Sequence, residues 1–235
     1  MQDAKTGTKK KLSYRRILIR SIISIIAIGA AIFVLAGRVD YWQGWFFFSI
    51  FLIFMTGLGI FFTKRQDLMQ ERIRPGPGVK WWDKIFFTLY APLSFSISLL
   101  AAIDAGRFHW SPQLPIILYP VMFVLILIGS YIIYWAMWTN NFFSSRVRIQ
   151  TDRGQYVITD GPYRYVRHPG YVGMTIFAPA SALLLGSIYA LIPAAITIVL
   201  LIIRTYLEDI TLKKELPGYA DYTKQVRFRL IPGIW

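Results

Sequence analysis

The chain has no cysteine and only two histidines, His109 and His168, among its 235 residues. It therefore has no disulfide framework, no thiolate nucleophile and no thiolate metal ligand. Two imidazoles without a thiolate are too few for a structural zinc site. We accordingly expect no metal in this protein.

Acidic residues are also scarce, because 12 Asp and Glu stand against 26 Lys and Arg and leave a formal charge of +14. The basic residues cluster beside apolar runs instead of forming a stripe with interleaved polar side chains, which is the pattern of a nucleic-acid-binding surface. We therefore expect anionic lipid to be the partner of these charges and expect no nucleic acid.

Hydrophobic residues make up 55% of the chain, and the mean hydropathy is +0.47. This composition is typical of an integral membrane protein. About twenty apolar residues cross ~30 Å of hydrocarbon at ~1.5 Å per residue. Four runs approach or exceed that length: residues 17–36, 42–63, 85–103 and 115–138. The first run exceeds the core of roughly 7 to 15 residues in a cleaved signal peptide, so we interpret it as an uncleaved span.

A further apolar stretch, residues 171–203, is too long for one span and short for two full ones. Gly186 and Ser187 interrupt it, which predicts a helical hairpin whose two ends lie on one side of the membrane. The Arg-Pro-Gly-Pro-Gly sequence at residues 74–78 cannot be helical and predicts a loop. There is no internal repeat and no Asp, Glu or Lys in the middle of any run, which disfavours a channel or an ion-coupled carrier.

The distribution of basic residues predicts the topology. With the amino terminus in the cytosol, only Arg38 and Arg107 fall in outer loops. The other 24 lie on the inner side, with seven up to Arg20, six in residues 64–84, five in residues 146–167 and six from Arg204 onward. The positive-inside rule then requires an even number of crossings. We predict an all-α polytopic membrane protein of about six transmembrane helices with both termini cytosolic, in the cytoplasmic membrane if the source is prokaryotic.

Polar and aromatic residues gather in residues 161–173, which read Gly-Pro-Tyr-Arg-Tyr-Val-Arg-His-Pro-Gly-Tyr-Val-Gly. Pro162 and Pro169 fix the backbone, and the glycines permit close approach or positive φ, so we expect a shaped loop that enters a helix near Tyr171. A basic juxtamembrane loop that holds lipid headgroups is the simpler interpretation of this stretch taken alone.

Arg204 and Glu208 follow the predicted hairpin at helical spacing i and i+4. Taken alone, they indicate an ion pair on a helix surface. The hairpin, however, returns them to the membrane face that carries residues 161–173. We therefore expect a pocket that is half cytosolic and half within the bilayer, suited to a polar cofactor from water and a lipophilic substrate from the membrane.

Six motifs in the second half of the chain resemble the isoprenylcysteine carboxyl methyltransferase family and its prokaryotic relatives. They are Gln155-Tyr-Val-Ile158, Gly161-Pro-Tyr163, Arg167-His-Pro-Gly-Tyr171-x-Gly173, Arg204-x-x-x-Glu208-Asp209, Tyr219-x-x-Tyr222 and Arg229-Leu-Ile-Pro232. The resemblance covers about residues 140–235 and extends to the third and fourth apolar runs, whereas the first two runs are not diagnostic. It implies a membrane enzyme that uses S-adenosyl-L-methionine without a Rossmann domain. Relatives often carry two adjacent glutamates where this chain has Glu208 and Asp209, and the Gly-x-x-Tyr before the final tyrosine is shortened to Gly218-Tyr219.

The resemblance implies roles for individual residues and a division of the chain. Arg204 faces the substrate as the catalytic residue, and the cofactor lies against Gln155, Tyr156, Val157, Ile158, Tyr163, His168, Pro169, Gly170, Tyr171 and Glu208. Residues 1–84 form an amino-terminal basic segment with two spans and a cytosolic loop. Residues 85–235 form the methyltransferase core, with the cofactor loop 140–170, the hairpin 171–206 and a carboxyl-terminal cap.

The acceptor of the methyl group stays open, since a prenylcysteine-like carboxylate and a lipid amine both suit such a pocket. Two other functions also stay open. One is an NADPH-dependent membrane reductase resembling the steroid-reductase branch, which shares the membrane hairpin. The other is a non-enzymatic membrane carrier or scaffold, in which the polar residues named above are dispensable.

Overall fold

A computed structural model describes residues 14–235, and the first cluster of lysines lies outside the described residues. The described part of the chain is helical and contains no strand. Five of its helices are long and apolar enough to span a membrane. They are α1 (Tyr14–Ala36), α2 (Trp42–Lys64), α4 (Trp81–Ala101) with its π-helical extension η1 (Ala102–Phe108), α5 (Leu118–Thr139) and α7 (Leu191–Glu215). The predicted all-α polytopic membrane architecture is confirmed.

A shorter apolar helix, α6 (Pro169–Leu184), makes the predicted hairpin with α7. Gly186 turns the chain between them with φ +83°, a value that glycine adopts without steric cost. The 16 residues of α6 rise ~24 Å at ~1.5 Å each, which is less than the ~30 Å of a hydrocarbon core. The predicted six spans are thus five full-length helices and one shorter helix.

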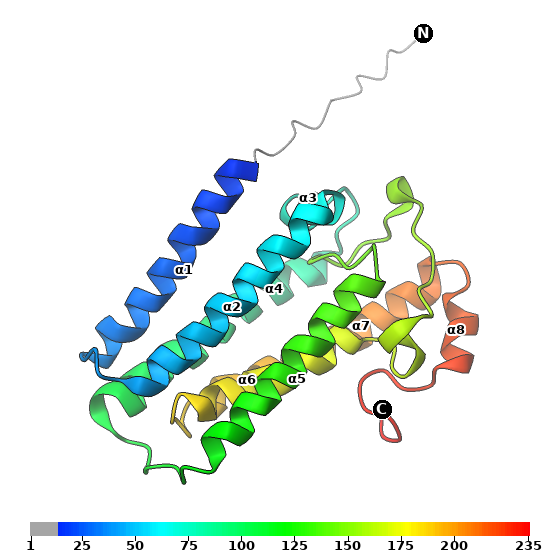
Figure 1. Cartoon of the computed structure of the whole chain (residues 1–235). Coiled ribbons are helices and arrows are strands. Elements are labelled where there is room, and N and C mark those ends of the chain that lie inside the picture. The colour runs from blue at the N-terminus through cyan, green and yellow to red at the C-terminus, as the bar shows by residue number, and fades with distance from the viewer. Residues whose placement is uncertain (1–13) are drawn as a thin grey trace.

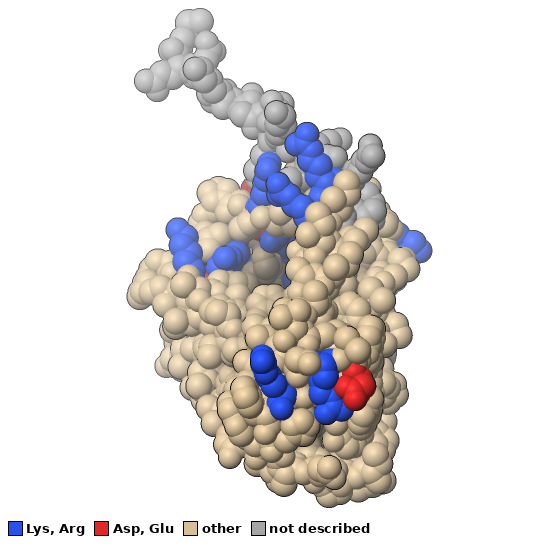
Figure 2. Space-filling model, turned by 90° about the vertical axis from the view of Figure 1, so that its left-hand side faces the viewer, with Lys and Arg blue, Asp and Glu red and all other residues tan. Residues whose placement is uncertain are grey.

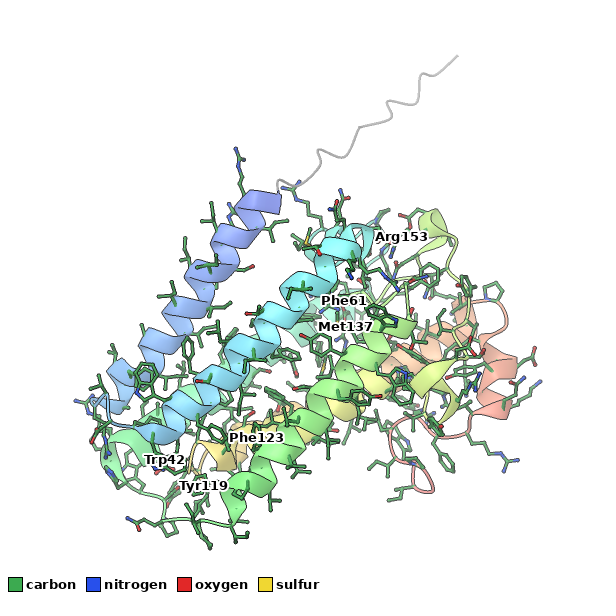
Figure 3. All side chains as sticks on the ribbon, viewed as in Figure 1. Trp42, Phe61, Tyr119, Phe123, Met137 and Arg153 are labelled. Atoms are coloured by element: carbon green, nitrogen blue, oxygen red, sulfur yellow. The ribbon has the colours of Figure 1, made fainter. Side chains whose placement is uncertain are left out.

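The polar segment after α2 is only partly a loop. Residues 66–73 form helix α3 (Gln66–Ile73), and the Pro-Gly sequence that follows is non-helical, as predicted. Leu68 on α3 is fully buried and packs with Phe61 of α2 and Met137 of α5. Figure 3 shows Phe61 and Met137 between these two helices. The contact holds α3 against the end of the bundle.

Helices α5 and α6 cross where two glycines face each other. A Cβ atom on Gly173 would lie 2.5 Å from the carbonyl oxygen of Gly129 and 2.7 Å from Cγ1 of Ile133. No side chain fits at that distance, so the crossing depends on glycine at this position. Because Gly173 lies one turn into α6, the crossing also sets the position of the polar loop that precedes the helix.

The third apolar run does not end in a loop at residue 104 as expected, because the helix continues as η1 to Phe108. Asp104 is fully buried there. It accepts hydrogen bonds from the backbone N–H of Ser111 at 2.7 Å and from the hydroxyl of Ser187 at 2.5 Å. These bonds compensate the burial of a polar group and tie the end of α4 to the turn of the α6–α7 hairpin.

The remaining polar segments gather at the end of the molecule opposite that turn. Helix α3, residues 140–168, the end of α7 and helix α8 (Tyr219–Gln225) lie together there (Figure 1). Figure 2 shows basic side chains gathered at the upper end of the molecule and a smaller group of basic and acidic side chains in the lower part, and a broad band of described surface between them carries no charged residue. An uncharged band of this kind is typical of a surface that faces lipid tails. The two polar segments that bracket the hairpin are therefore on the same side, as predicted.

Candidate functional site

A cavity of about 310 Å³ lies at this end, between α4, the 140–168 segment, α6, α7 and α8. Its size is at the lower end of the range of ligand pockets. All eleven residues predicted to bind cofactor or substrate line it: Gln155, Tyr156, Val157, Ile158, Tyr163, His168, Pro169, Gly170, Tyr171, Arg204 and Glu208. The fold thus brings the predicted site residues together.

The loop before α6 has the shape that its prolines and glycines predict. Gly161 adopts φ +56° and begins a short 3₁₀ helix, Gly161–Arg164, in which Tyr163 is buried. The Tyr163 hydroxyl accepts a hydrogen bond from Asn140 at 3.1 Å, and Tyr222 of α8 donates to the Tyr163 carbonyl at 2.7 Å. Burial raises the pKa of Tyr163 well above its usual range, so this phenol stays neutral at physiological pH.

Asp209 connects the loop, α7 and the carboxyl-terminal segment. Its side chain is fully buried and accepts hydrogen bonds from Arg167 at 2.7 and 3.0 Å, from Arg229 at 2.9 Å and from the Tyr219 hydroxyl at 3.1 Å. The backbone adds two bonds, because the N–H groups of Arg167 and His168 donate to the carbonyls of Phe228 and Arg229. The buried carboxylate thus fixes the backbone on which His168 stands.

His168, Tyr171 and Glu208 form one continuous wall of the cavity. The rings of His168 and Tyr171 are stacked, with centroids 5.7 Å apart and planes 6° apart. The Tyr171 hydroxyl donates a hydrogen bond to Oε2 of Glu208 at 2.5 Å. A flat aromatic surface therefore ends in a carboxylate, an arrangement that suits a ligand with a planar ring and a cationic or hydroxyl group.

Arg204 is buried beside this wall, with 5% of its surface exposed. Its guanidinium lies over the rings of Phe86, Phe87 and Tyr171 at 4.6, 5.0 and 5.3 Å. Nη2 donates to the Ser145 carbonyl at 2.8 Å. Arg204 and Glu208 do not form the surface ion pair that their spacing alone indicates, because Glu208 bonds to Tyr171 instead.

The carboxylate beside Arg204 is Asp83 of α4. Nη2 of Arg204 lies 3.0 Å from Oδ1 of Asp83, yet the atoms are not aligned as a hydrogen bond, and both Oδ1 and the Nε of Arg204 are buried without a hydrogen-bond partner in residues 14–235. A buried donor without a partner is costly and marks a position where a ligand can bind. Asp83 is fully buried and accepts its aligned bond from the N–H of Val147 at 3.0 Å.

The remaining predicted residues build the floor and rim. The Gln155 side chain accepts a hydrogen bond from the N–H of Gln150 at 2.6 Å, and Tyr156 is exposed at the rim. A Cβ atom on Gly170 would lie 2.6 Å from the ring of Phe143, so the close approach predicted for this glycine is observed.

Several lining residues were not predicted, among them Arg72, Phe87, Tyr90, Asn140 and Arg148. Arg148 is held by Glu71 at 2.7 Å and by Asp152 at 2.7 Å, which makes its role structural. Arg72 belongs to α3, in the segment predicted as a loop. The sequence shows these residues only as basic or aromatic positions near the ends of apolar runs, and the packing of α3 and α4 against residues 140–148 brings them to the site.

A smaller apolar hollow of about 130 Å³ adjoins the cavity within the helix bundle. Both volumes share Tyr90 and Met174 in their walls. The hollow is otherwise lined by α2, α4, α5 and α6, mostly through aromatic and aliphatic side chains such as Phe47, Phe54 and Ile133. The polar cavity thus shares wall residues with an apolar space among the apolar helices.

Comparison with known proteins finds a family match over the region that carries this site. No curated protein sequence matches the chain. The helices α1 to α4 lie outside the family match, which begins in α5 and ends in α7. Residues 121–214 match the model of the isoprenylcysteine carboxyl methyltransferase family, so the resemblance to these membrane methyltransferases is confirmed over the part of the chain that includes His168, Arg204 and Glu208.

Proposed function

We propose that this protein is an S-adenosyl-L-methionine-dependent methyltransferase that acts on a lipophilic acceptor at the boundary between membrane and cytosol. The observation that carries the proposal is a single cavity in which the wall of His168, Tyr171 and Glu208 adjoins the buried Arg204, next to an apolar hollow. The wall suits a polar cofactor, and the side with Arg204 and the hollow suits the acceptor. The strong bias of basic residues toward one side supports a cytosolic location for both termini.

The residues of the first wall fit the cofactor's chemistry. The Glu208 carboxylate suits the ammonium group or the ribose hydroxyls, and the stacked rings of His168 and Tyr171 suit the adenine or the sulfonium. When bound, the cofactor supplies an electrophilic methyl group on a sulfonium. The chain's own residues then have three tasks: they bind both reactants, align them and keep water away.

The environment of Arg204 favours an acceptor that carries a carboxylate. Its Nη2 already donates to the Ser145 carbonyl and lies 3.0 Å from Asp83, but its Nε is buried without a hydrogen-bond partner in residues 14–235. A carboxylate is an acceptor that suits such a free donor on a planar guanidinium. A prenylcysteine-like carboxylate is the acceptor implied by the family, and a lipid amine is the alternative.

Cofactor binding tests the proposal on the detergent-solubilised protein. Titration with S-adenosyl-L-methionine should give saturable heat, and NADPH should give none. His168→Ala and Glu208→Ala should each weaken cofactor binding by about 1–3 kcal/mol, since each removes a buried or charge-assisted hydrogen bond. His109→Ala is the matched control, because His109 is exposed, follows η1 and does not line the cavity.

Three outcomes decide between the functions. Binding of NADPH alone would replace the methyltransferase by a reductase, and binding of neither cofactor would favour a carrier or scaffold. Unchanged affinity in both site variants would remove the site assignment. The acceptor itself is identified by mass spectrometry of native lipid extracts incubated with the protein and methyl-labelled cofactor.

A further inference from the structure

The charges around Arg204, in the part of the cavity proposed to bind the acceptor, do not balance. Three guanidiniums line this part of the cavity, from Arg72, Arg146 and Arg204, and the carboxylates beside them are Asp83 and Glu208. The other two arginines of the cavity wall are already paired, Arg148 with Glu71 and Arg167 with Asp209. A surplus of positive charge in a partly buried cavity is unfavourable unless an anion is bound there.

Arg72 makes few contacts that compensate its charge. Its side chain is partly buried at the end of α3, and no carboxylate of residues 14–235 lies within ion-pair distance of it. Nη1 donates one hydrogen bond, to the Phe143 carbonyl at 3.1 Å, and the guanidinium lies 5.6 Å from the centre of the Phe143 ring. Burial and the positive charge of Arg204 lower the pKa of Arg72 to about 10, which still leaves it charged at neutral pH.

Ser145 is hydrogen-bonded to both Arg72 and Arg204, although these arginines come from helices far apart in the sequence. The hydroxyl of Ser145 donates to the Arg72 carbonyl at 2.7 Å, and the Ser145 carbonyl accepts from Nη2 of Arg204 at 2.8 Å. Both side chains line the same cavity. Two like charges that line one cavity repel each other, and a shared anion converts the repulsion into two attractive contacts.

We propose that Arg72 and Arg204 together bind one anionic group of the acceptor, a carboxylate or a phosphate ester, and that Arg72 makes the protein select acceptors with a negatively charged headgroup. This inference rests on the proposed methyltransferase function. It adds a specificity residue from α3, a helix outside the segment matched by the family. Since the cofactor brings a net positive charge of its own, the acceptor that completes the cavity must carry the negative one.

The test compares headgroups on one short chain. Purified full-length protein, saturated with the unreactive cofactor product S-adenosylhomocysteine, is titrated with decanoate, decyl phosphate, 1-decanol and decylammonium in the same detergent. The wild type should bind at least one of the two anions roughly tenfold or more tightly than decanol, and decylammonium no more tightly than decanol. The preference should shrink as salt is added. Comparing the affinities for decanoate and decyl phosphate distinguishes a carboxylate site from a phosphate site.

Variants of Arg72 test whether this residue causes the preference for anionic headgroups. Arg72→Gln should weaken binding of the preferred anion by roughly 10- to 100-fold and leave decanol within about twofold. Arg72→Lys, which keeps the charge and loses the planar fork, should fall between the wild type and Arg72→Gln. Arg74→Gln is the matched control, because Arg74 is exposed two residues away and does not line the cavity.

Equal binding of all four amphiphiles by the wild type would overturn the inference, whether or not the variants fold. So would an Arg72→Gln variant that binds the anions like Arg74→Gln. Cofactor binding, measured on the same samples, separates this failure from failure of the proposed function. If the wild type binds the cofactor but binds all four headgroups equally, only the role of Arg72 is contradicted. If the wild type binds no cofactor, the proposed methyltransferase function itself is contradicted.

Discussion

Asp209 should be the residue on which the stability of the functional end depends most. Its carboxylate is fully buried and is surrounded by the guanidiniums of Arg167 and Arg229, the hydroxyl of Tyr219 and, at 3.6 Å, Nε2 of His168. Asp209→Asn keeps the volume of the side chain and removes its charge. The variant then leaves Arg167 buried, with 3% of its side chain exposed and no carboxylate to balance it.

The expected cost follows from that uncompensated charge. Removing one partner of a buried ion pair costs about 3–5 kcal/mol, far more than the net value of the intact pair. For a protein of this size, a loss of 1 kcal/mol lowers the melting temperature by roughly 2–4 °C. The cofactor-free variant should therefore melt about 6–20 °C below the wild type. Thermal unfolding in detergent, followed by intrinsic tryptophan fluorescence, measures this shift.

Asp221→Asn controls for the loss of a negative charge. Asp221 is exposed on α8 and pairs with Lys224 at 2.7 Å, an exposed contact of a kind that contributes little to stability. Its melting temperature should stay close to that of the wild type. If Asp209→Asn melted within about a degree of Asp221→Asn, the claim that the buried carboxylate holds the loop, α7 and the carboxyl-terminal segment together would be refuted.

Three further predictions concern the acceptor, the helix crossing and the topology. Arg204→Lys should raise the acceptor's apparent KM or lower turnover and leave cofactor affinity nearly unchanged, because lysine lacks the planar donor edge; a parallel loss of cofactor affinity would count against an acceptor role. Gly173→Ala should destabilise the protein by about 1–3 kcal/mol, since its Cβ would lie 2.5 Å from the Gly129 carbonyl oxygen; an unchanged melting temperature would show that the α5–α6 crossing adjusts freely. Gln113→Cys, at an exposed site in a chain without native cysteine, should react with an impermeant thiol reagent only from the outer side; labelling from the cytosolic side alone would reverse the predicted topology.

The sequence alone determined the class of the fold and most of the helix boundaries. Apolar runs of about twenty residues leave little choice in a membrane, because only a helix satisfies its own backbone hydrogen bonds there. Gly186 marked the hairpin turn, and Pro162, Pro169 and the neighbouring glycines marked the shaped loop before α6. All eleven predicted site residues line one cavity, because the hairpin returns Arg204 and Glu208 to the side of that loop.

Only the tertiary structure decided which groups face each other across the site. Helical spacing placed Glu208 one turn from Arg204, yet Glu208 bonds to Tyr171 and Arg204 lies beside Asp83, because α4 packs against α7 at that point. Arg72 was assigned to a loop and is instead on α3. Tyr171 lies 37 residues from Glu208 in the sequence, and Asp83 lies on a different helix from Arg204, so both contacts depend on the packing of whole helices. Periodicity along the chain reports only the face that a helix buries and not what it is buried against.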